Sequence, residues 1–491
     1  MQELKRLARH GATYGVAEAI SRLAGFLLIP VYTSYLQTED YGRLQIISIT
    51  IELIGIFISF GISDAIYRFY FEQKNEKDKK TIVSSGVITV SVLATIIVLI
   101  ISQFGDELSL LLFGETESSK YIKIAFVTLL FGVFHTLLLT YFRLMKKSLI
   151  YLILSVCKLI LTLSVIITLV AYYEYGLIGV FVGNMVTAVV FGSAGLLYLY
   201  KKIGIHYSLS KVREMASYSL PIIPAYLSMM VINVSDRYIV KMILGLSDVA
   251  IYTLGYKLGN VIHYFVRVPF MQIWLPRRYE LYHSGAEPEM FSKIATYYIG
   301  LMFWSGLAVS VLVHDVIKVI SSNDYWDAAQ YAPAIALCYV IYGLDQHLSF
   351  GIHVAKKTKY LSYINTVVAV LNIILNWYLI TAYGIWGAVI ATFLSFVIRN
   401  VALYFYGKRF YSIPFEWNNM LKLLLISMVL YLLKYLTLDQ SMLISLVIDI
   451  VLIISFIPLV VAFKAIDESE IKIIKNKAAI YVRKLQNYLS S

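Results

Sequence analysis

The sequence predicts an all-α integral membrane protein with fourteen transmembrane helices, arranged as two pseudo-symmetric lobes of six helices followed by two extra C-terminal helices. Hydrophobic residues make up 59% of the 491 residues and charged residues only 15%, whereas soluble domains carry about 25% charged residues. Long apolar runs such as 151–172 and 442–463 can each cross a hydrocarbon core of about 30 Å. Such runs form helices because the backbone must satisfy its own hydrogen bonds in lipid.

The apolar runs and the polar breaks between them place the fourteen spans and divide the chain into four regions. The regions are an N-lobe at 1–205, a C-lobe at 206–412, helices thirteen and fourteen at 413–464, and a basic amphipathic tail at 465–491 that we expect on the inner leaflet. The expected spans are 10–36, 40–71, 82–103, 121–146, 149–173, 175–200, 214–243, 247–279, 291–314, 328–354, 359–382, 384–408, 418–436 and 441–463.

The connecting loops predict the orientation of the chain. Lysine and arginine gather in alternate loops, for example at 74–80 and 143–147, whereas the loop at 104–119 has four acidic residues and no base. Basic loops stay in the cytoplasm, so we expect both termini inside. The net charge of +12 then reflects topology and anionic lipid headgroups, and we expect no nucleic-acid partner.

Two landmarks recur at a fixed offset and predict an internal repeat. Asp40 and Asp248 stand at matching polar breaks after long apolar helices, 208 residues apart, and Gly176 and Gly384 begin matching helices at the same offset. The Lys146 and Lys356 positions differ by 210, so a small insertion lies between the landmarks. Two sets of six helices that both start inside form a parallel repeat about an axis along the membrane normal.

Nothing in the sequence indicates chemistry on a bound cofactor. The two cysteines, Cys157 and Cys338, cannot form a disulfide framework or a paired-cysteine metal site. There is no phosphate-binding loop, zinc-protease motif or nucleophile elbow. We therefore expect no enzymatic activity, no catalytic residue, no cofactor and no metal; two lobes with little mass outside the membrane are typical of a carrier.

Charged residues within the spans are the candidate functional residues, because each costs about 2.5–3.5 kcal/mol at a helix centre. Glu18 and Arg22 are four residues apart on helix one, where they form either a structural ion pair or a cavity-facing arginine tuned by its neighbour. On helix eight one face carries Lys257, Asn260, His263 or Tyr264, and Arg267. This stripe indicates an anion or a water-filled space, although Arg267 could instead reach the membrane surface.

Helices two and seven carry further charges. Glu52 is near the middle of helix two, and Asp64 and Arg68 follow at a spacing of four, which favours a structural pair. Asp236 and Arg237 are adjacent in sequence and point to different faces, so we do not expect them to pair with each other.

Other polar residues within the spans are expected first to hold helices together, with lining of the transport path as the alternative for the charged or ionisable ones. The charged or ionisable residues in this set are Lys158, Asp345, His347 and Arg399. Helix eleven adds three asparagines on one face, Asn365, Asn372 and Asn376, a residue type that commonly joins membrane helices.

Characteristic motifs lie around the two matching breaks and at the ends of nearby helices. They are Pro221-Ile222-Ile223-Pro224, Ser235-Asp236-Arg237-Tyr238, Ser247 to Tyr252, Leu28-Ile29-Pro30, Glu39-Asp40-Tyr41-Gly42, Ser63-Asp64-Ala65 and Arg68-Phe69-Tyr70. With these motifs the chain resembles the multidrug/oligosaccharidyl-lipid/polysaccharide exporter superfamily. Within it, the chain resembles the polysaccharide transporter branch, the Wzx-type flippases of O-antigen and capsule synthesis. The resemblance covers nearly the whole chain.

The resemblance implies a central cavity lined by helices one, two, seven and eight, and a cargo of undecaprenyl-diphosphate-linked oligosaccharide in a bacterial cytoplasmic membrane. It also implies alternating access, a lipid tail that stays in the bilayer, and polysaccharide polymerase machinery as a partner; we expect a monomer. Arginine suits diphosphate contacts. The expected substrate-binding residues are Arg22, Lys257, Arg267, Glu18, Asn260, Asp236 and Arg237, and the expected proton- or ion-coupling residues are Glu52, His263 and Asp64.

Several other functions stay open at this point. A cation-coupled drug exporter of the same superfamily should have intramembrane acids without matching bases, whereas here bases accompany the acids. A flippase for lipid-linked peptidoglycan precursors has nearly the same charge requirement. An integral-membrane polymerase or ligase should have a large external loop, and the external loops here are short. A scaffold would leave the repeat and the buried charges unexplained.

Overall fold

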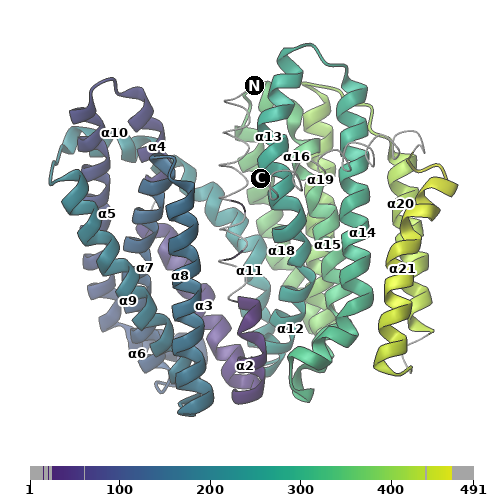
Figure 1. Ribbon diagram of the computed structural model, residues 1–491, viewed down its shortest axis with the longest axis horizontal. Helices are drawn as coiled ribbons and strands as arrows, with labels where there is room; N and C mark the ends of the chain where they lie inside the picture. The colour runs from purple at the N-terminus through teal and green to yellow at the C-terminus, as the bar shows by residue number, and fades with distance from the viewer. Residues whose placement is uncertain (1–14, 16–19, 21–24, 60, 437–439, 467–491) are drawn as a thin grey trace, which may run out of the picture. The chain divides into compact units, whose positions relative to one another are not determined.

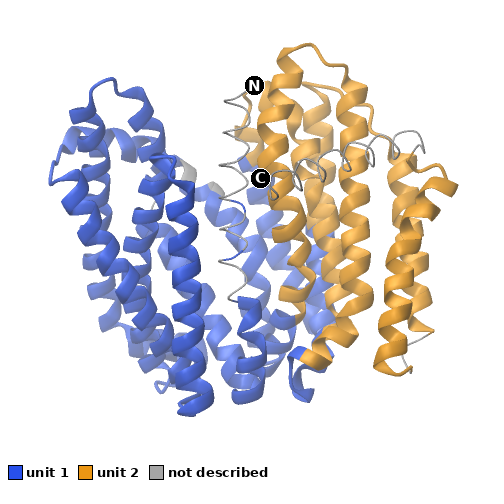
Figure 2. Ribbon diagram, in the orientation of Figure 1, with its two compact units in different colours: residues 1–254, 320–328, 362–395 blue, residues 255–319, 329–361, 396–491 orange. Residues whose placement is uncertain are grey.

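The computed structural model describes residues 15, 20, 25–59, 61–436 and 440–466, and every structural statement below concerns these residues. All of their regular elements are helices (Figure 1). About half of the expected helix one, including Glu18 and Arg22, and nearly all of the expected tail lie outside the described residues. The chain forms two compact units (Figure 2): unit 1 comprises 1–254, 320–328 and 362–395, and unit 2 comprises 255–319, 329–361 and 396–491.

Among the described residues, ten helices are long and apolar enough to cross a membrane. The chain is therefore a multi-pass membrane protein, as the composition predicts, while the count of fourteen spans stays a prediction. The agreement is close where the apolar runs are uninterrupted: the span expected at 149–173 is observed at 148–172, and that expected at 384–408 is observed at 385–408.

Helix α7 (Ser119–Leu144) is the centre of the N-terminal bundle in unit 1. It packs against α3 (Thr38–Ser59), α5 (Glu76–Gln103), α8 (Ser148–Ile167) and α9 (Gly176–Ile203). The contact with α9 is the most extensive, because small residues of α9 face α7. A Cβ atom on Gly192 would lie 2.3 Å from the carbonyl oxygen of Phe131, so only glycine permits this approach.

The structure adds an interruption and a helix to the expectations for the N-terminal half. The span expected at 40–71 is observed as one candidate span, Thr38–Glu72. Its helix is interrupted at Gly61, which has a φ of +67° that favours glycine, and α4 (Ile62–Glu72) begins after it. The expected loop at 104–119 contains helix α6 (Gly105–Phe113). Its acidic first turn lies at the positive end of the helix dipole, which is favourable. The prediction considered only the charges of this segment, so it missed the apolar residues in the second half of α6.

The two copies of the repeated polar break contact each other inside unit 1. The first joins α2 (Ile29–Tyr35) to α3, and the second joins α11 (Ile223–Ile243) to α12 (Leu246–Gly259). The hydroxyls of Thr38 and Ser247 are 3.0 Å apart. A Cβ on Gly42 would lie only 1.9 Å from the carbonyl oxygen of Leu246, so the start of α3 is pressed against the start of α12.

The second half departs from the prediction at prolines and at short interruptions. The span expected at 214–243 is divided into α10 (Leu209–Ser219), the 3₁₀ turn η2 (Leu220–Ile222) and α11, because Pro221 cannot donate a backbone hydrogen bond. The span expected at 328–354 consists of the end of η4 (Asn323–Gln330), α15 (Ala332–Gly343), α16 (Asp345–Leu348) and α17 (Phe350–Val354).

Unit 2 contains the remaining helices. The π-helix η3 (His263–Arg267) packs on α13 (Val268–His283). Helix α20 (Trp417–Tyr435) packs along α21 (Met442–Ala462), as Figure 1 shows. Helix α14 (Pro288–Ile320) also belongs largely to this unit. Helices α18 (Lys359–Tyr383) and α19 (Ile385–Lys408) each have one end in unit 1 and one in unit 2.

Candidate functional site

A cavity of about 340 Å³ lies within unit 1, and we call it the N-unit cavity. Helices α3, α4, α5, α7 and α8 line it. Its volume falls within the range of about 300–1,000 Å³ that is usual for small-molecule sites. Much of the wall is apolar, as in most such sites, and five polar side chains project from four of the helices: Glu52, Ser59, Ser63, Thr136 and Lys158.

The wall of the N-unit cavity carries one carboxylate, that of Glu52, and one ammonium group, that of Lys158. Neither Glu52 nor Lys158 forms an ion pair or a hydrogen bond with another residue that the structure describes. His135 lies close enough to Lys158 to interact electrostatically, and its buried ring packs edge-to-face on Phe191. An ammonium attracts an anionic group, while carboxylate and hydroxyl oxygens accept hydrogen bonds from sugar-like hydroxyls.

The structure therefore corrects the expectation for Lys158, which the sequence favoured as a helix–helix contact. It is the only charged residue in the apolar run 151–172, and that isolation was the available signal. The expected coupling residue Glu52 lies on the wall of the same cavity. The sequence could not place the two together, because the rotation of α8 relative to α3 depends on tertiary packing.

Asp64 has a different partner from the one expected. Its Oδ2 accepts a hydrogen bond of 2.8 Å from the hydroxyl of Tyr226 on α11. Arg68 pairs with Glu72 at 3.1 Å and lies over the ring of Tyr218 at 4.5 Å. The predicted Asp64–Arg68 pair is therefore wrong, because Glu72 stands at the same spacing of four on the other side of Arg68.

Asp236 and Arg237 do pair with each other, contrary to the prediction. Both are buried, and Nη1 of Arg237 is 3.1 Å from Oδ1 of Asp236. That oxygen also accepts from the backbone N–H of Arg237 at 2.8 Å, while Tyr252 donates to Oδ2 at 2.6 Å. The long guanidinium side chain folds back along the helix, so the helix geometry that separates adjacent Cβ atoms does not separate the charges.

The expected asparagine contacts are present around α18 and α19. Asn372 and Asn376 are fully buried, and Asn376 donates to Oδ1 of Asn372 at 3.0 Å. Asn372 in turn donates to Ser395 at 3.0 Å and accepts from Ser235 of α11 at 3.0 Å. These side chains therefore join three helices of unit 1, as the sequence predicts for that face.

In unit 2 a buried aspartate is shared by two arginines, and we call Asp345, Arg267 and Arg399 the Asp345 cluster. Nη2 of Arg267 lies 2.7 Å from Oδ1, and Nη1 of Arg399 lies 3.5 Å from Oδ2. Both guanidinium groups lie over the ring of Tyr342, at 4.4 and 5.4 Å. Asp345 and Arg399 thus hold helices together as expected, and Arg267 is buried with them.

The rest of the expected stripe on helix eight divides between α12 and η3. Lys257 is half-buried on α12, and Asn260 follows that helix with a buried Oδ1 that no described residue hydrogen-bonds. His263 packs on the rings of Tyr339 and Tyr342 at 5.4 and 5.7 Å. The π-helix changes the angular spacing that the prediction assumed.

The roles of Lys257, Asn260, His263, Arg267, Asp236, Arg237 and Asp64 toward cargo or protons stay predictions.

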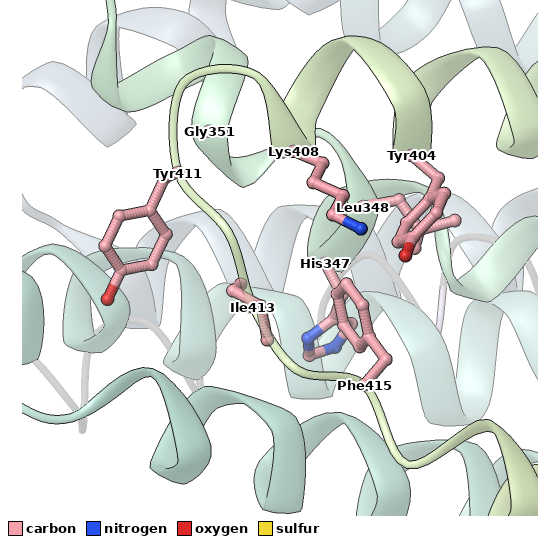
Figure 3. Close-up of a pocket in the computed structure, with 8 residues that line it drawn as sticks. All are labelled: His347, Leu348, Gly351, Tyr404, Lys408, Tyr411, Ile413 and Phe415. Atoms are coloured by element: carbon pink, nitrogen blue, oxygen red, sulfur yellow. The ribbon is translucent and has the colours of Figure 1, made fainter.

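A second cavity lies in unit 2 and is much smaller, about 10 Å³, the room of one water molecule. Figure 3 shows its lining, in which His347, Lys408 and Tyr404 contribute polar atoms. The Nε2 of His347 is buried without a described hydrogen-bond partner, and its ring stacks on Trp274 at 5.9 Å. This cavity is too small for a sugar or a lipid headgroup, so of these two cavities among the described residues the N-unit cavity is the candidate site.

A family model described as polysaccharide biosynthesis protein matches residues 7–281, which is more than half of the chain. The comparison with curated proteins gives no match.

Solved structures of flippases and transporters share the fold. The lipid II flippase MurJ in an inward closed conformation has a TM-score of 0.72 at 19% identity, covering 90% of this chain and 97% of that one. An inward-facing multidrug resistance MATE family transporter of the MOP superfamily has a TM-score of 0.66 at 14% identity, covering 80% and 94%. A point mutant of the MATE transporter VcmN of Vibrio cholerae has a TM-score of 0.60 at 15% identity, covering 83% and 98%.

Proposed function

The chain belongs to the polysaccharide biosynthesis protein family, and from that premise we propose that it is a flippase for undecaprenyl-diphosphate-linked oligosaccharides. It would move these units across the bacterial cytoplasmic membrane for assembly of a surface polysaccharide such as O-antigen, capsule or exopolysaccharide. The observation that carries the proposal is the family match over residues 7–281 on a chain with the fold of a lipid-linked-precursor flippase. Polysaccharide synthesis on a membrane carrier requires this step.

The cargo contains a multivalent anion and several hydroxyl groups, and the protein offers groups for both. We assign the diphosphate to basic residues, namely Arg22, Lys257 and Arg267, with Glu18, Asn260, Asp236 and Arg237 as further contacts. Lys158 adds a base on the wall of the N-unit cavity, beside hydroxyl and carboxylate groups that suit a sugar. Ammonium and guanidinium groups form the stronger, charge-assisted hydrogen bonds with phosphate.

Alternating access would carry the head group across while the lipid tail stays in the bilayer. Glu52, His263 and Asp64 are the residues we assign to proton or ion coupling. Glu52 is the best placed of these, because its carboxylate shares a cavity with Lys158 and has no described partner of its own. Both termini would be cytoplasmic, and the protein would act as a monomer that passes its cargo to a polymerase.

Lipid analysis of a deletion strain tests the function. Lipid-linked oligosaccharide should accumulate on the cytoplasmic side, and surface polysaccharide should be lost while synthesis of the repeat unit continues. The trapped glycan would identify the cargo. Restoring the gene should release it, and a gene encoding the Arg22→Ala, Lys257→Ala double variant, expressed at the same membrane level, should not.

Two other outcomes would replace the proposal. Accumulation of a lipid-linked peptidoglycan precursor would indicate that the chain is a flippase for that precursor. Normal surface polysaccharide with altered tolerance of cationic drugs would indicate a drug exporter, the function named for the multidrug resistance MATE structure. The acidic residues, and not the basic ones, would then form the binding site.

A further inference from the structure

Three helices of unit 2 meet around a buried lysine, and we call Lys434, Asp315, Asp449 and Ser445 the Lys434 cluster. Lys434 is one residue from the end of α20, Asp315 is in the last turns of α14, and Ser445 and Asp449 are on α21. Lys434, Asp315 and Asp449 are 1%, 5% and 0% exposed.

The two carboxylates of the Lys434 cluster are not equivalent. Oδ2 of Asp315 accepts a hydrogen bond of 3.2 Å from Nζ of Lys434 and one of 2.5 Å from the hydroxyl of Ser445. Asp449 is also close to Lys434, with Oδ1 2.7 Å from Nζ, and its carboxyl group lies within hydrogen-bonding reach of Asp315. The hydroxyl of Ser445 donates to Asp315 and not to Asp449, although the side chain of Asp449 is entirely buried.

The charges of the cluster do not balance if both carboxyl groups are ionised. One ammonium and two carboxylates leave a net negative charge between packed helices, where an uncompensated charge costs several kcal/mol. One bound proton makes the cluster neutral. Lys434 contacts both carboxyl groups, so it does not distinguish them. The hydrogen bond from Ser445 goes to Asp315 alone and favours the ionised form of Asp315, so the proton belongs on Asp449.

Among the residues that the structure describes, no neighbouring group supplies the missing positive charge. His314 and Lys318 are the other ionisable groups of α14 in this region. Lys318 is exposed, so water and headgroups screen it. An imidazole is mostly uncharged at neutral pH, so His314 adds little charge. On α20 the hydroxyl of Tyr435 is 3.1 Å from that of Tyr431. Among the described residues no group of three His, Cys, Asp or Glu side chains could hold a metal ion.

We propose that Asp449 carries an exchangeable proton and that the Lys434 cluster is a proton-binding site where α20 and α21 attach to α14. A second link in this attachment is the hydrogen bond of 3.0 Å from Trp304 Nε1 on α14 to the carbonyl of Ile453 on α21. Loss of the proton leaves a buried negative charge at the Lys434 end and weakens the attachment there. The site is independent of the cargo and of the proposed function.

Infrared spectroscopy of the full-length protein in lipid vesicles tests the proposal, because a protonated carboxyl group has a carbonyl band apart from the carboxylate and amide bands. The wild type should show such a band at neutral pH, shifted by exchange into D₂O, and Asp449→Asn should lack it. Asp315→Asn should lack it too, because the remaining carboxylate then neutralises Lys434. Lys434→Met should strengthen it. Asp327→Asn, on the exposed η4 turn, is the matched control and should leave it unchanged.

Each contrary result overturns the proposal. Identical carboxyl spectra for wild type and Asp449→Asn mean that both aspartates are ionised. If the band persists in Asp315→Asn, Asp449 stays protonated although Lys434 has no other carboxylate, so charge balance does not determine its protonation. A band that disappears when sodium replaces choline means that the site takes a metal cation instead. Size-exclusion chromatography checks folding, and Asp315→Asn gives an independent answer if Asp449→Asn does not fold.

Discussion

Replacing Asp345 by asparagine removes the carboxylate that two buried arginines share. In the wild type Asp345 lies 2.7 Å from Arg267 and 3.5 Å from Arg399, and all three side chains are at least nine-tenths buried. An asparagine of the same shape leaves two guanidinium groups in one buried space with no counter-ion. The net charge of the Asp345 cluster rises from +1 to +2.

The expected loss of unfolding free energy follows from the contacts. Removing one partner of a buried ion pair costs about 3–5 kcal/mol, because the other charge stays uncompensated. Arg399→Gln should cost much less, about 1 kcal/mol, because the short Arg267–Asp345 contact then remains as a neutral pair. Arg267→Gln should fall between them, since it leaves Asp345 with the longer contact alone.

The assay is reversible unfolding of the purified protein in detergent micelles, followed by helix content or tryptophan fluorescence. The matched control is Asp327→Asn on the exposed η4 turn, expected within about 0.5 kcal/mol of the wild type. The double variant Asp345→Asn, Arg267→Gln restores the charge of +1. It should therefore lose less stability than the sum of the two single variants.

Two results would refute this reasoning. If Asp345→Asn costs less than about 1 kcal/mol, comparable to an ordinary hydrogen bond, then water or a headgroup already screens the Asp345 cluster. If Arg399→Gln destabilises as much as Asp345→Asn, the shared carboxylate is not the centre of the interaction.

Three other variants test separate features. Gly42→Ala should lower stability by about 1–3 kcal/mol, because the added methyl would lie 1.9 Å from a carbonyl oxygen of α12; thermal unfolding measures it. Arg43 hydrogen-bonds Glu115 and so lowers its pKa; that stabilisation is complete at neutral pH and lost as pH falls through the lowered pKa, so Glu115→Gln should flatten the acid limb of the stability profile. Lys158→Gln should slow release of trapped glycan about tenfold, or about 1.4 kcal/mol, while the exposed Lys147→Gln should not; equal rates would remove Lys158 from the site.

The membrane-spanning helices were the most predictable part of the fold, because hydrophobic length is a local property of the sequence. The runs that became α8, α9, α18, α19 and α21 were located to within a few residues. Breaks inside runs were harder to predict. Gly61 and Pro221 interrupt expected spans because of local backbone chemistry, yet a glycine or a proline within an apolar run does not show by itself whether the helix bends or ends.

Partners of the buried charges could not be predicted from spacing, because they depend on how each helix is rotated about its axis. Asp345 and Arg399 are 54 residues apart, and Arg68 had acidic neighbours four residues away on both sides. The Lys434 cluster had a usable signal that was missed. Helices thirteen and fourteen are apolar, follow each other closely, and carry Lys434 and Asp449 respectively, so two charges of opposite sign predict a contact.

The expected repeat allows individual residues of the two halves of the chain to be compared. At an offset of 208 residues Arg267 corresponds to Ser59 and Arg399 to Phe191, and at the offset of 210 found near the lysine pair Asp345 corresponds to His135. The correspondence holds in space as well as in sequence. Asp345 contacts Arg399 in unit 2, and His135 packs on Phe191 in unit 1.

The same place in the two copies is therefore built in opposite ways. In the second half, two long arginines and an aspartate fill the interior, and the shared carboxylate of Asp345 contacts both arginines. In the first copy, Ser59 is too short to fill the equivalent space and lines the N-unit cavity, where Lys158 and Glu52 have no partners among the described residues. One half of the chain thus has buried charges that support its own packing, and the other half has charges without partners among the described residues. Variants of the Asp345 cluster should therefore lower stability, and should lower transport only as a consequence. Variants of the N-unit cavity should lower transport while stability is unchanged.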